Sequence, residues 1–538
     1  MLNLTMAGTA RVAVPPQQAP GRTWRGLCAP VAGWVAWLAM LTSPLAAQPD
    51  PAQSPRRNVV FILADDLGWA ETGPYGQQKI PTPNIDRLAA QGMRFTQHYS
   101  GAPVCAPSRC VLLTGQHSGH AEIRGNQQAK KLFPEFEEGQ HPLSEQVRTL
   151  PQHFREHGYA TAAMGKWGLG PVGSTGDPNA KGLDLFVGYN CQAVAHSYYP
   201  PFLWRNNEQF PINPRPVPGH APAVTGDVDY ADRLGAVYAP QRLVEEAVTF
   251  IEQHAERPFF LYFPCIEPHV AMHPPREEVE RFPADWDPTP YRGQCGYLAH
   301  PRPRAAYAAM VARVDAYVGR LLDALERTGT ADRTLVIFSS DNGTTHPHNG
   351  DPVFHVGGVD ARFFHSTADL RGYKGSLYEG GIRVPAIARL PGVIPAGTVS
   401  NQPGYFPDWF PTLCEAAGLP RPDGLDGHSL WPVLTGQEPR VERAPMVWVF
   451  PEYGGQVAVR WDDWKLVRQK LKTKRPGPWE LYRLDTDHAE QHDLAAEHPA
   501  EVAHGLEILR EQLLPNAIFP VPVPGVNVPE PDNDPQTK

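Results

Sequence analysis

The chain has 538 residues, of which 41% are hydrophobic and 20% are charged, and this balance is typical of a globular protein and excludes disorder of the whole chain. Its 57 acidic residues outnumber its 48 lysines and arginines, which leaves a formal charge of -9. That charge argues against a nucleic-acid partner, because phosphates demand a basic face. An anionic substrate must therefore meet a local cluster of positive groups.

The first 47 residues have the pattern of an export signal. Three arginines precede an apolar run at 31–42, and Leu45-Ala46-Ala47 is a small-residue cleavage site. The apolar run is shorter than the roughly 20 residues that span a bilayer. We therefore expect a cleaved signal at 1–47, a short leader at 48–57, no transmembrane anchor, and a protein that is periplasmic or secreted.

Four continuous apolar runs each end close to a polar residue, and such runs predict buried strands of a parallel sheet. Segments with helical periodicity lie between the runs, so strands and helices alternate. The runs are 58–64, 160–165, 259–266 and 334–338, and the helical segments are 84–91, 151–157, 241–254 and 304–328. The pattern predicts an α/β fold with a mostly parallel central sheet, in which ligands bind at the carboxyl ends of the strands.

Loops and a second domain complete the predicted organisation. Two long stretches, 187–238 and 343–370, have no clear periodicity, and long loops of this kind are usually functional walls or lids. Beyond the catalytic domain at 58–423 the pattern weakens. Short strands at 464–467 and 479–482 and a helix at 499–514 predict a smaller C-terminal α+β domain at 424–515, followed by a Pro-rich tail at 516–538.

The segment from Cys105 to Gly115 (CAPSRCVLLTG) predicts a short helix. Pro107 is typical of a first helical turn and Gly115 of a helix end. Cys105 then lies at the helix N-terminus, where free N–H groups favour an anion. Two further motifs, Asp65-Asp66 and Asp341-Asn342, supply the hard oxygen ligands that suit calcium or magnesium.

Together these motifs resemble the sulfatase family of the alkaline-phosphatase-like superfamily, whose signature is C-x-P-S-R followed by L-x-T-G. The resemblance covers almost all of the chain after residue 58. It implies a large α/β/α sandwich, and it implies that a formylglycine-generating enzyme oxidises Cys105 to formylglycine, whose hydrated aldehyde is the nucleophile. The activity implied is the hydrolysis of sulfate monoesters.

The resemblance also assigns roles to individual positions. The four residues of the Asp65-Asp66 and Asp341-Asn342 motifs, with the modified Cys105, would hold calcium, with magnesium the less suitable ion. Arg109 would steady the nucleophile. The groups that bind sulfate and transfer protons would be Lys166, His269 and Lys374.

The chain departs from the family at one position. Family members often carry K-W-H-L-G, whereas this chain reads Lys166-Trp167-Gly168-Leu169-Gly170. Glycine cannot move a proton, so another residue would have to replace the missing histidine. We take His117 and His120, one helix length beyond Cys105, as the candidates.

Substrate selection is expected to come from the long loops. Aromatic, imidazole and guanidinium groups suit a sugar that carries further anionic groups. The candidate substrate-binding residues are His117, His120, Arg124, His196, Trp204 and Arg205, with further histidines at 346, 348, 355 and 365. Because the chain is expected to be exported, we favour a sulfated glycan over a small aryl sulfate.

Three other interpretations remain open at this point. A phosphoric ester hydrolase of the same superfamily would normally present Ser or Thr as its nucleophile. A non-catalytic, calcium-dependent glycan-binding protein would result if Cys105 were never oxidised. A zinc site of Cys105, Cys110, His117 and His120 would leave Pro107-Ser108-Arg109 unexplained.

Overall fold

The computed structural model describes residues 56–230, 233–348 and 351–526, all within one compact unit, Pro55–Lys538. The predicted export signal at 1–47 lies outside the described residues, as do most of the leader and the last twelve residues of the tail. No helix in the described ranges is both long enough and apolar enough to cross a membrane.

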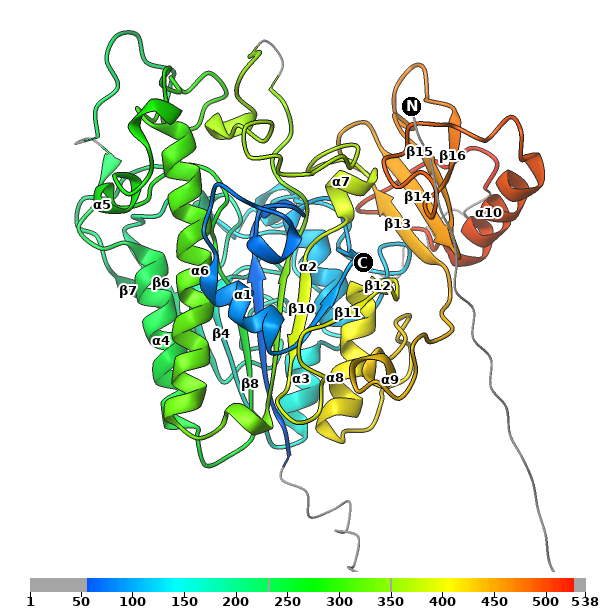
Figure 1. Cartoon of the computed structure of the whole chain (residues 1–538), viewed down its shortest axis with the longest axis horizontal. Coiled ribbons are helices and arrows are strands. Elements are labelled where there is room, and N and C mark those ends of the chain that lie inside the picture. The colour runs from blue at the N-terminus through cyan, green and yellow to red at the C-terminus, as the bar shows by residue number, and fades with distance from the viewer. Residues whose placement is uncertain (1–55, 231–232, 349–350, 527–538) are drawn as a thin grey trace, which may run out of the picture. The chain divides into compact units, whose positions relative to one another are not determined.

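A ten-stranded mixed sheet forms the centre of this unit (Figure 1), in the order β11-β2-β10-β9-β1-β8-β4-β5-β6-β7. The neighbouring strands from β9 to β5 are all parallel, so the expected parallel centre is confirmed. The bounds are β1 Asn58–Ala64, β2 Met93–Phe95, β4 Ala160–Lys166, β5 Leu185–Tyr189, β6 Phe202–Arg205, β7 Glu208–Pro211, β8 Phe259–Pro264, β9 Thr334–Ser340, β10 Ala386–Arg389 and β11 Thr398–Ser400.

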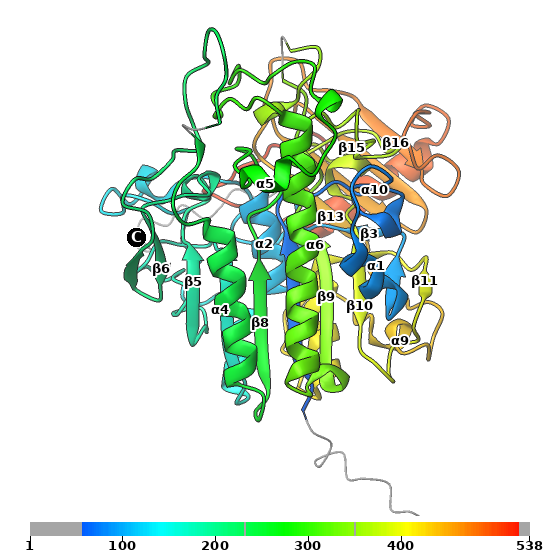
Figure 2. The same cartoon turned by 60° about the vertical axis from the view of Figure 1, so that its left-hand side comes forward.

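Helices cover both faces of the sheet, because its central strands are apolar on both sides. Side chains of α1, α4 and α6 share one buried cluster with the sheet, and those of α2, α3 and α8 share the other. Figure 2 shows α4 and α6 running side by side across one face. The bounds are α1 Pro83–Ala90, α2 Cys105–Thr114, α3 Leu150–Glu156, α4 Ala239–Gln253, α5 Arg276–Val279, α6 Pro303–Arg327, α7 Glu379–Ile382, α8 Trp409–Ala417 and α9 Trp431–Leu434.

One of the two predicted irregular stretches has regular structure. The stretch at 187–238 contains β6 and β7, which form an antiparallel hairpin that extends the sheet beyond β5. Its two-residue turn begins at Asn206, whose φ of 52° suits the left-handed turn residues that hairpins require. In the other stretch, 343–370, the described residues form a 3-10 turn, Val356–Gly358, and an isolated bridge between Pro347 and His355 but no longer helix or strand, so its described part is a long loop as expected.

A second, four-stranded antiparallel sheet lies in the C-terminal part of the chain, in the order β13-β14-β15-β16. Helix α10, Pro499–Gln512, packs on it through Ile508 and Leu509. The bounds are β13 Met446–Phe450, β14 Gln456–Trp461, β15 Trp464–Arg468 and β16 Trp479–Arg483; a two-stranded pair, β3 His98–Tyr99 and β12 Gly404–Tyr405, completes the strands. The predicted strands and helix of this region are thus present.

Candidate active site

The polar residues predicted at the strand ends meet at one edge of the large sheet. Asp65 and Asp66 follow β1, Asp341 and Asn342 follow β9, and Lys166 ends β4. His269 comes from the turn after β8, Cys105 begins α2, and Lys374 comes from the loop before α7. Because β1, β4, β8 and β9 are parallel, their carboxyl ends bring these side chains together.

The carboxylate of Asp65 forms ion pairs with two buried, positively charged side chains. Lys166 Nζ lies 2.6 Å from its Oδ2, and Arg109 Nη2 lies 3.6 Å from its Oδ1. Burial alone would raise the pKa of this carboxyl, but the charges of Lys166 and its neighbours hold the pKa well below its usual range. Asp65 is therefore ionised. Burial lowers the pKa of Lys166, but Asp65 and the neighbouring anionic groups together raise it by more, so Lys166 stays protonated.

Asp66 lies between a lysine, a histidine and an amide. Lys374 Nζ is 2.7 Å from Asp66 Oδ2, His269 Nε2 is 3.5 Å from the same oxygen, and Asn342 Nδ2 donates to Oδ1 at 2.7 Å. The backbone of Asp66 is left-handed, with φ at 63°. Aspartate tolerates this conformation better than most residues, and it turns the chain sharply after β1.

Arg109, a residue of α2, forms hydrogen bonds with residues at the ends of two strands of the same centre. Its Nε and Nη2 donate to Asp341 Oδ2 at 3.1 and 2.7 Å, and its Nη1 donates to the carbonyl of Lys166 at 2.7 Å. The guanidinium is fully buried. A fork of this kind fixes the orientation of the helix that carries Cys105 relative to β4 and β9.

Cys105 is the first residue of α2 and only 2% exposed. Its Sγ lies 3.3 Å from Asp65 Oδ1 and 3.6 Å from Lys374 Nζ. Burial, together with the charge of Asp65, raises the pKa of this thiol far above its ordinary value. The unmodified sulfur is thus protonated at neutral pH and is not an activated nucleophile, since only the thiolate attacks.

The centre has the composition of a metal site. Ligand atoms of Asp65, Asp66, Cys105 and His269 lie within 4.8 Å of one another. Asn342 Oδ1 is buried and has no hydrogen-bond partner among the residues that the structure describes. A buried amide oxygen without a donor, beside two carboxylates, fits a hard divalent cation.

A stack of aromatic rings forms one wall of this centre. His269 Nδ1 donates to the carbonyl of Val270, so its Nε2 faces Asp66. The ring of His196 stacks on that of His269, with centroids 4.5 Å apart and planes inclined by 15°, and His196 Nδ1 lies 2.7 Å from His220 Nε2. Tyr297 lies against both of these outer histidines.

Gly168 and Gln192 explain how the chain fills the position of the missing histidine. A Cβ atom at Gly168 would lie only 1.7 Å from Gln192 Nε2. That nitrogen donates to the carbonyl of Trp167 at 3.2 Å, while Gln192 Oε1 is buried without a described partner. The glutamine therefore occupies the space that a larger residue at position 168 would need.

The structure does not bring His117 and His120 to the centre. Both lie beyond the C-terminal end of α2, and the ten residues of that helix place them about 15 Å along its axis from Cys105. His120 Nδ1 is 2.9 Å from Asp426 Oδ1, and His117 Nε2 is 3.1 Å from Gln512 Oε1. Their proposed proton transfer at Cys105, and a zinc site shared with Cys105, do not fit this placement.

Three other candidate substrate-binding residues have partners elsewhere. Arg124 donates to the backbone carbonyls of 119, 121 and 514. Trp204 Nε1 donates to Glu138 at 2.6 Å, and Arg205 pairs with Glu246 at 3.0 Å. Of the six candidates, only His196 thus lies against the central group.

Residues 192, 220 and 297 belong to this neighbourhood although the sequence did not single them out. They lie in irregular segments, so no periodicity points to them. Gln192 lies in the loop after β5. The pairing of β5 with β4, which is seen only in the structure, brings this loop beside the end of β4. His220 and Tyr297 become neighbours only through an isolated bridge between their own residues.

Comparison with known proteins agrees with this geometry. Residues 57–419 match the family model Sulfatase, and residues 372–514 match N-sulphoglucosamine sulphohydrolase, C-terminal. Arylsulfatase D of Homo sapiens is 30% identical over 449 residues, covering 73% of this chain and 71% of that protein. The N-acetylgalactosamine-6-sulfatase of Canis lupus familiaris is 33% identical over 432 residues, covering 76% and 72%.

A solved structure extends the likeness to the fold. Ps i-CgsB, in complex with k-i-k-neocarrahexaose, aligns with a TM-score of 0.67 and 26% identity, covering 85% of this chain and 92% of that one. The family model spans the segment that carries every strand-end residue of the centre. The chain therefore belongs to the sulfatase family of the alkaline-phosphatase-like superfamily and is a sulfuric ester hydrolase.

Proposed function

We propose that this sulfatase acts through a formylglycine formed from Cys105, beside a calcium ion held at the ends of β1 and β9. The observation that carries the proposal is the position of Cys105, at a helix N-terminus and within 3.6 Å of both Asp65 and Lys374. Burial raises the pKa of the Cys105 thiol and disfavours its thiolate, so the unmodified sulfur is a poor nucleophile. A hydrated aldehyde would supply a better one, and a formylglycine-generating enzyme would be the partner that makes it.

The charges of the centre support the calcium. Three cations, Arg109, Lys166 and Lys374, face the three carboxylates of Asp65, Asp66 and Asp341, so the side chains alone leave little net charge. A divalent cation would make the centre positive and would polarise the oxygens of a sulfate ester. Oxygens of Asp65, Asp66, Asp341 and Asn342 would hold it, and these hard ligands suit calcium.

The side chains around Cys105 can perform the remaining chemistry. The ammonium group of Lys166 donates to Asp65 and that of Lys374 to Asp66, and both would bind the non-bridging sulfate oxygens. Arg109 would hold the N-terminus of α2 in place.

His269 or Lys374 would protonate the departing alcohol. Burial lowers the pKa of Lys374, but Asp66 and neighbouring anionic groups raise it by more, so Lys374 carries a proton. Burial lowers the pKa of His269 and its Nδ1 is bound to a backbone carbonyl, so His269 would first have to take up a proton at Nε2.

A sulfated glycan is the substrate that we propose. The centre lies beside imidazole and phenol rings of His196, His220 and Tyr297, and such rings suit the hydroxyls and CH faces of sugars. The similar N-acetylgalactosamine-6-sulfatase and the oligosaccharide complex of Ps i-CgsB support the same class. Export to the periplasm or medium would bring the enzyme to polysaccharides.

Mass spectrometry of the peptide containing Cys105, combined with a sulfate-release assay, tests the proposal. We expect an aldehyde mass at position 105, no turnover in Cys105→Ala, and near-normal turnover in Cys110→Ala, a buried cysteine farther along the same helix. An intact thiol with full turnover would contradict the nucleophile. An intact thiol with no turnover but calcium-dependent glycan binding would instead support the non-catalytic interpretation.

A further inference from the structure

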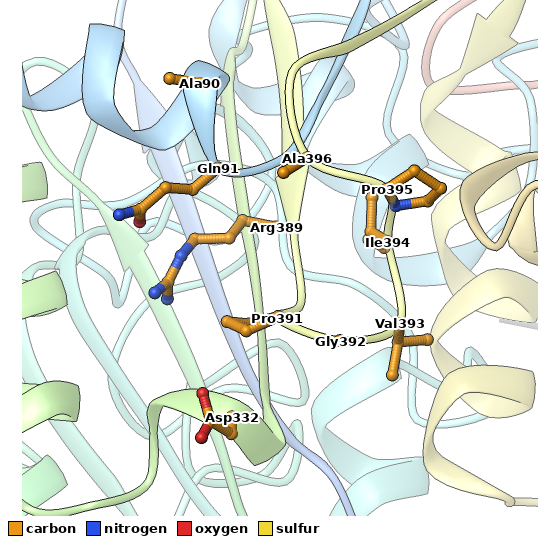
Figure 3. Close-up of a pocket in the computed structure, with 10 residues that line it drawn as sticks. All are labelled: Ala90, Gln91, Asp332, Arg389, Pro391, Gly392, Val393, Ile394, Pro395 and Ala396. Atoms are coloured by element: carbon orange, nitrogen blue, oxygen red, sulfur yellow. The ribbon is translucent and has the colours of Figure 1, made fainter.

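A cavity lies near the amino ends of the central strands, whereas the active site lies at their carboxyl ends. Figure 3 shows Gln91, Arg389 and Asp332 on one side of it and the loop 391–396 on the other. The cavity has a volume of about 570 Å³, which is the size of common small-molecule sites. Arg389 of β10 pairs with Val336, which lies near the start of β9. Along β9, Val336 is five residues, or about 16 Å, from Asp341 of the active site.

Arg389 is the unusual residue of this cavity. Its side chain is only 5% exposed, and among the described residues that side chain has neither a hydrogen bond nor an ion pair. Its Nε and Nη1 are both shielded from solvent and without partners among the described residues, and the residue lines the cavity. A buried guanidinium is normally paired with an anion, because removing its charge from water is costly.

The surroundings of Arg389 contribute acceptors and apolar surface. Gln91 Oε1 is buried and has no hydrogen-bond partner in the described part of the chain, and Asp332, whose side chain is exposed, lines the same cavity with its carboxylate. Both can accept from a donor on a ligand. The loop adds Pro391 and Pro395, whose rings offer the flat apolar surface on which the CH face of a sugar packs.

We propose that this cavity binds a hydroxylated carboxylate of the size of a uronic acid, as a site separate from the catalytic centre. The carboxylate would accept from Arg389, and hydroxyl groups would donate toward Gln91 and Asp332. A simple dianion such as sulfate fits less well, because it offers no donor and would be repelled by Asp332. The ligand chemistry is the same whether the uronate is free or a unit of a polymer.

Binding of two unsulfated probes tests this site without involving sulfate hydrolysis. Saturation-transfer NMR with free glucuronate and with a hyaluronan tetrasaccharide should show saturable binding, and neutral chitotetraose should show none. We expect Arg389→Met to weaken binding at least tenfold. The matched control Arg475→Met removes an exposed arginine elsewhere and should leave binding unchanged. Stronger binding of the tetrasaccharide would indicate a polymer, and equal binding a free acid.

Two further variants keep the test decisive. Arg389→Met should retain the sulfate-release activity, which shows that it is folded. Ala396→Trp should block the cavity while leaving Arg389 in place, and should abolish binding. Lys374→Ala should leave binding unchanged, because it alters only the catalytic centre. The inference would be wrong if neither probe bound the wild type, or if Arg389→Met and Ala396→Trp bound as well as the wild type. Neither result would bear on Cys105 or its modification.

Discussion

At the scale of single residues, the side chain of Gln192 fills the space that Gly168 leaves empty. Gly168 has a φ of 89°, and its missing side chain leaves room for the Gln192 amide. We expect Gly168→Ala to lower the free energy of unfolding by about 2–4 kcal/mol, since it combines backbone strain with a steric clash. Adding Gln192→Ala should remove the clash but leave the strain.

Urea unfolding of the wild type, both single variants and the double variant measures this coupling. The double variant should be about 1–2 kcal/mol more stable than the sum of the single effects predicts. Strictly additive losses would show that Gln192 moves aside without cost and that the two positions are independent.

The position of His269 gives a second prediction at this scale. If its Nε2 protonates the departing alcohol, His269→Ala should slow the hydrolysis of an alkyl or sugar sulfate by about 10²–10⁴-fold. An aryl sulfate with an acidic phenol needs little protonation, so its hydrolysis should slow much less. The ratio of the two kcat/KM values measures this difference and is insensitive to the fraction of active enzyme.

His120→Ala is the matched control, because His120 also faces a carboxylate but lies at the far end of α2. Its turnover should equal that of the wild type with both substrates. An equal loss with both substrates in His269→Ala would point to sulfate binding rather than proton transfer. A loss in His120→Ala would revive the interpretation that this histidine replaces the one missing at Gly168.

The sequence could predict the acidic and amide residues of the centre because they follow buried strands, whereas the roles of Arg109, His269 and Lys374 were predicted only from the resemblance to a family. Asp65 and Asp341 follow apolar runs, and parallel pairing brings such ends together. It could not predict which loop residues join them. His117 and His196 are equally suited to the chemistry by residue type, and only the fold separates the one at the far end of α2 from the one stacked on His269.

At the scale of secondary-structure elements, the end of α2 depends on Gly115. Its φ is 69°, its N–H donates to the carbonyl of Val111, and a Cβ there would meet Leu425 at 2.7 Å and Phe410 at 3.0 Å. We expect Gly115→Ala to cost about 2–4 kcal/mol of unfolding free energy, from left-handed strain plus overpacking.

Gly418 offers a matched comparison, since it ends α8 with a φ of 66° but has open space where a Cβ atom would lie. Gly418→Ala should cost only about 1 kcal/mol, the conformational part alone. Denaturant unfolding compares the two variants. Equal losses would mean that the packing of α2 against its neighbours is loose at this end.

The sequence predicts long or strongly apolar helices and strands more readily than short or half-exposed ones. The buried strands β1 and β9 show continuous hydrophobic runs, and α6 has 25 residues of helical pattern. The hairpin β6–β7 lies at the sheet edge, where half-exposed strands carry a weak signal. The four-residue antiparallel strand β10 was too short to stand out, although it continues the sheet beside β9.

At the scale of the whole molecule, the small sheet supports the active-site helix. Trp448 of β13 and Tyr99 share a buried cluster with Val104, the residue before Cys105, and Trp448 Nε1 donates to the carbonyl of Ser100 at 2.9 Å. The C-terminal sheet therefore packs directly behind the N-terminus of α2. A buried ion cluster strengthens the same junction.

Lys465 of β15 is the centre of that cluster. Its Nζ lies 2.9 Å from Glu379 Oε1 and 2.8 Å from Glu490 Oε1, and both the lysine and the carboxylates are fully buried. Burial raises the pKa of Glu490 to about 7. Burial would also raise the pKa of Glu379, but Lys465 and two arginines lower it to about 2.

The two carboxylates respond to pH in opposite directions. The pKa of Glu379 lies below its ordinary 4.5, so its stabilisation is present above that pH and is lost as the pH falls toward 2. The pKa of Glu490 lies above 4.5, so its contribution is present at acid pH and is lost as the pH rises through about 7. Lys465 limits that second loss by pairing with the ionised form.

Lys465→Met should therefore destabilise the protein in a pH-dependent way. At about pH 8 two buried carboxylates would lose their shared cation, and we expect a loss of about 3–5 kcal/mol in unfolding free energy. At about pH 5 Glu490 is already protonated in the fold, so the loss should be smaller. Glu490→Gln in the same chain should recover part of the stability at pH 8. Urea unfolding at both pH values measures the effect, and an equal loss at both would show that Lys465 contributes through packing of its side chain rather than through its charge.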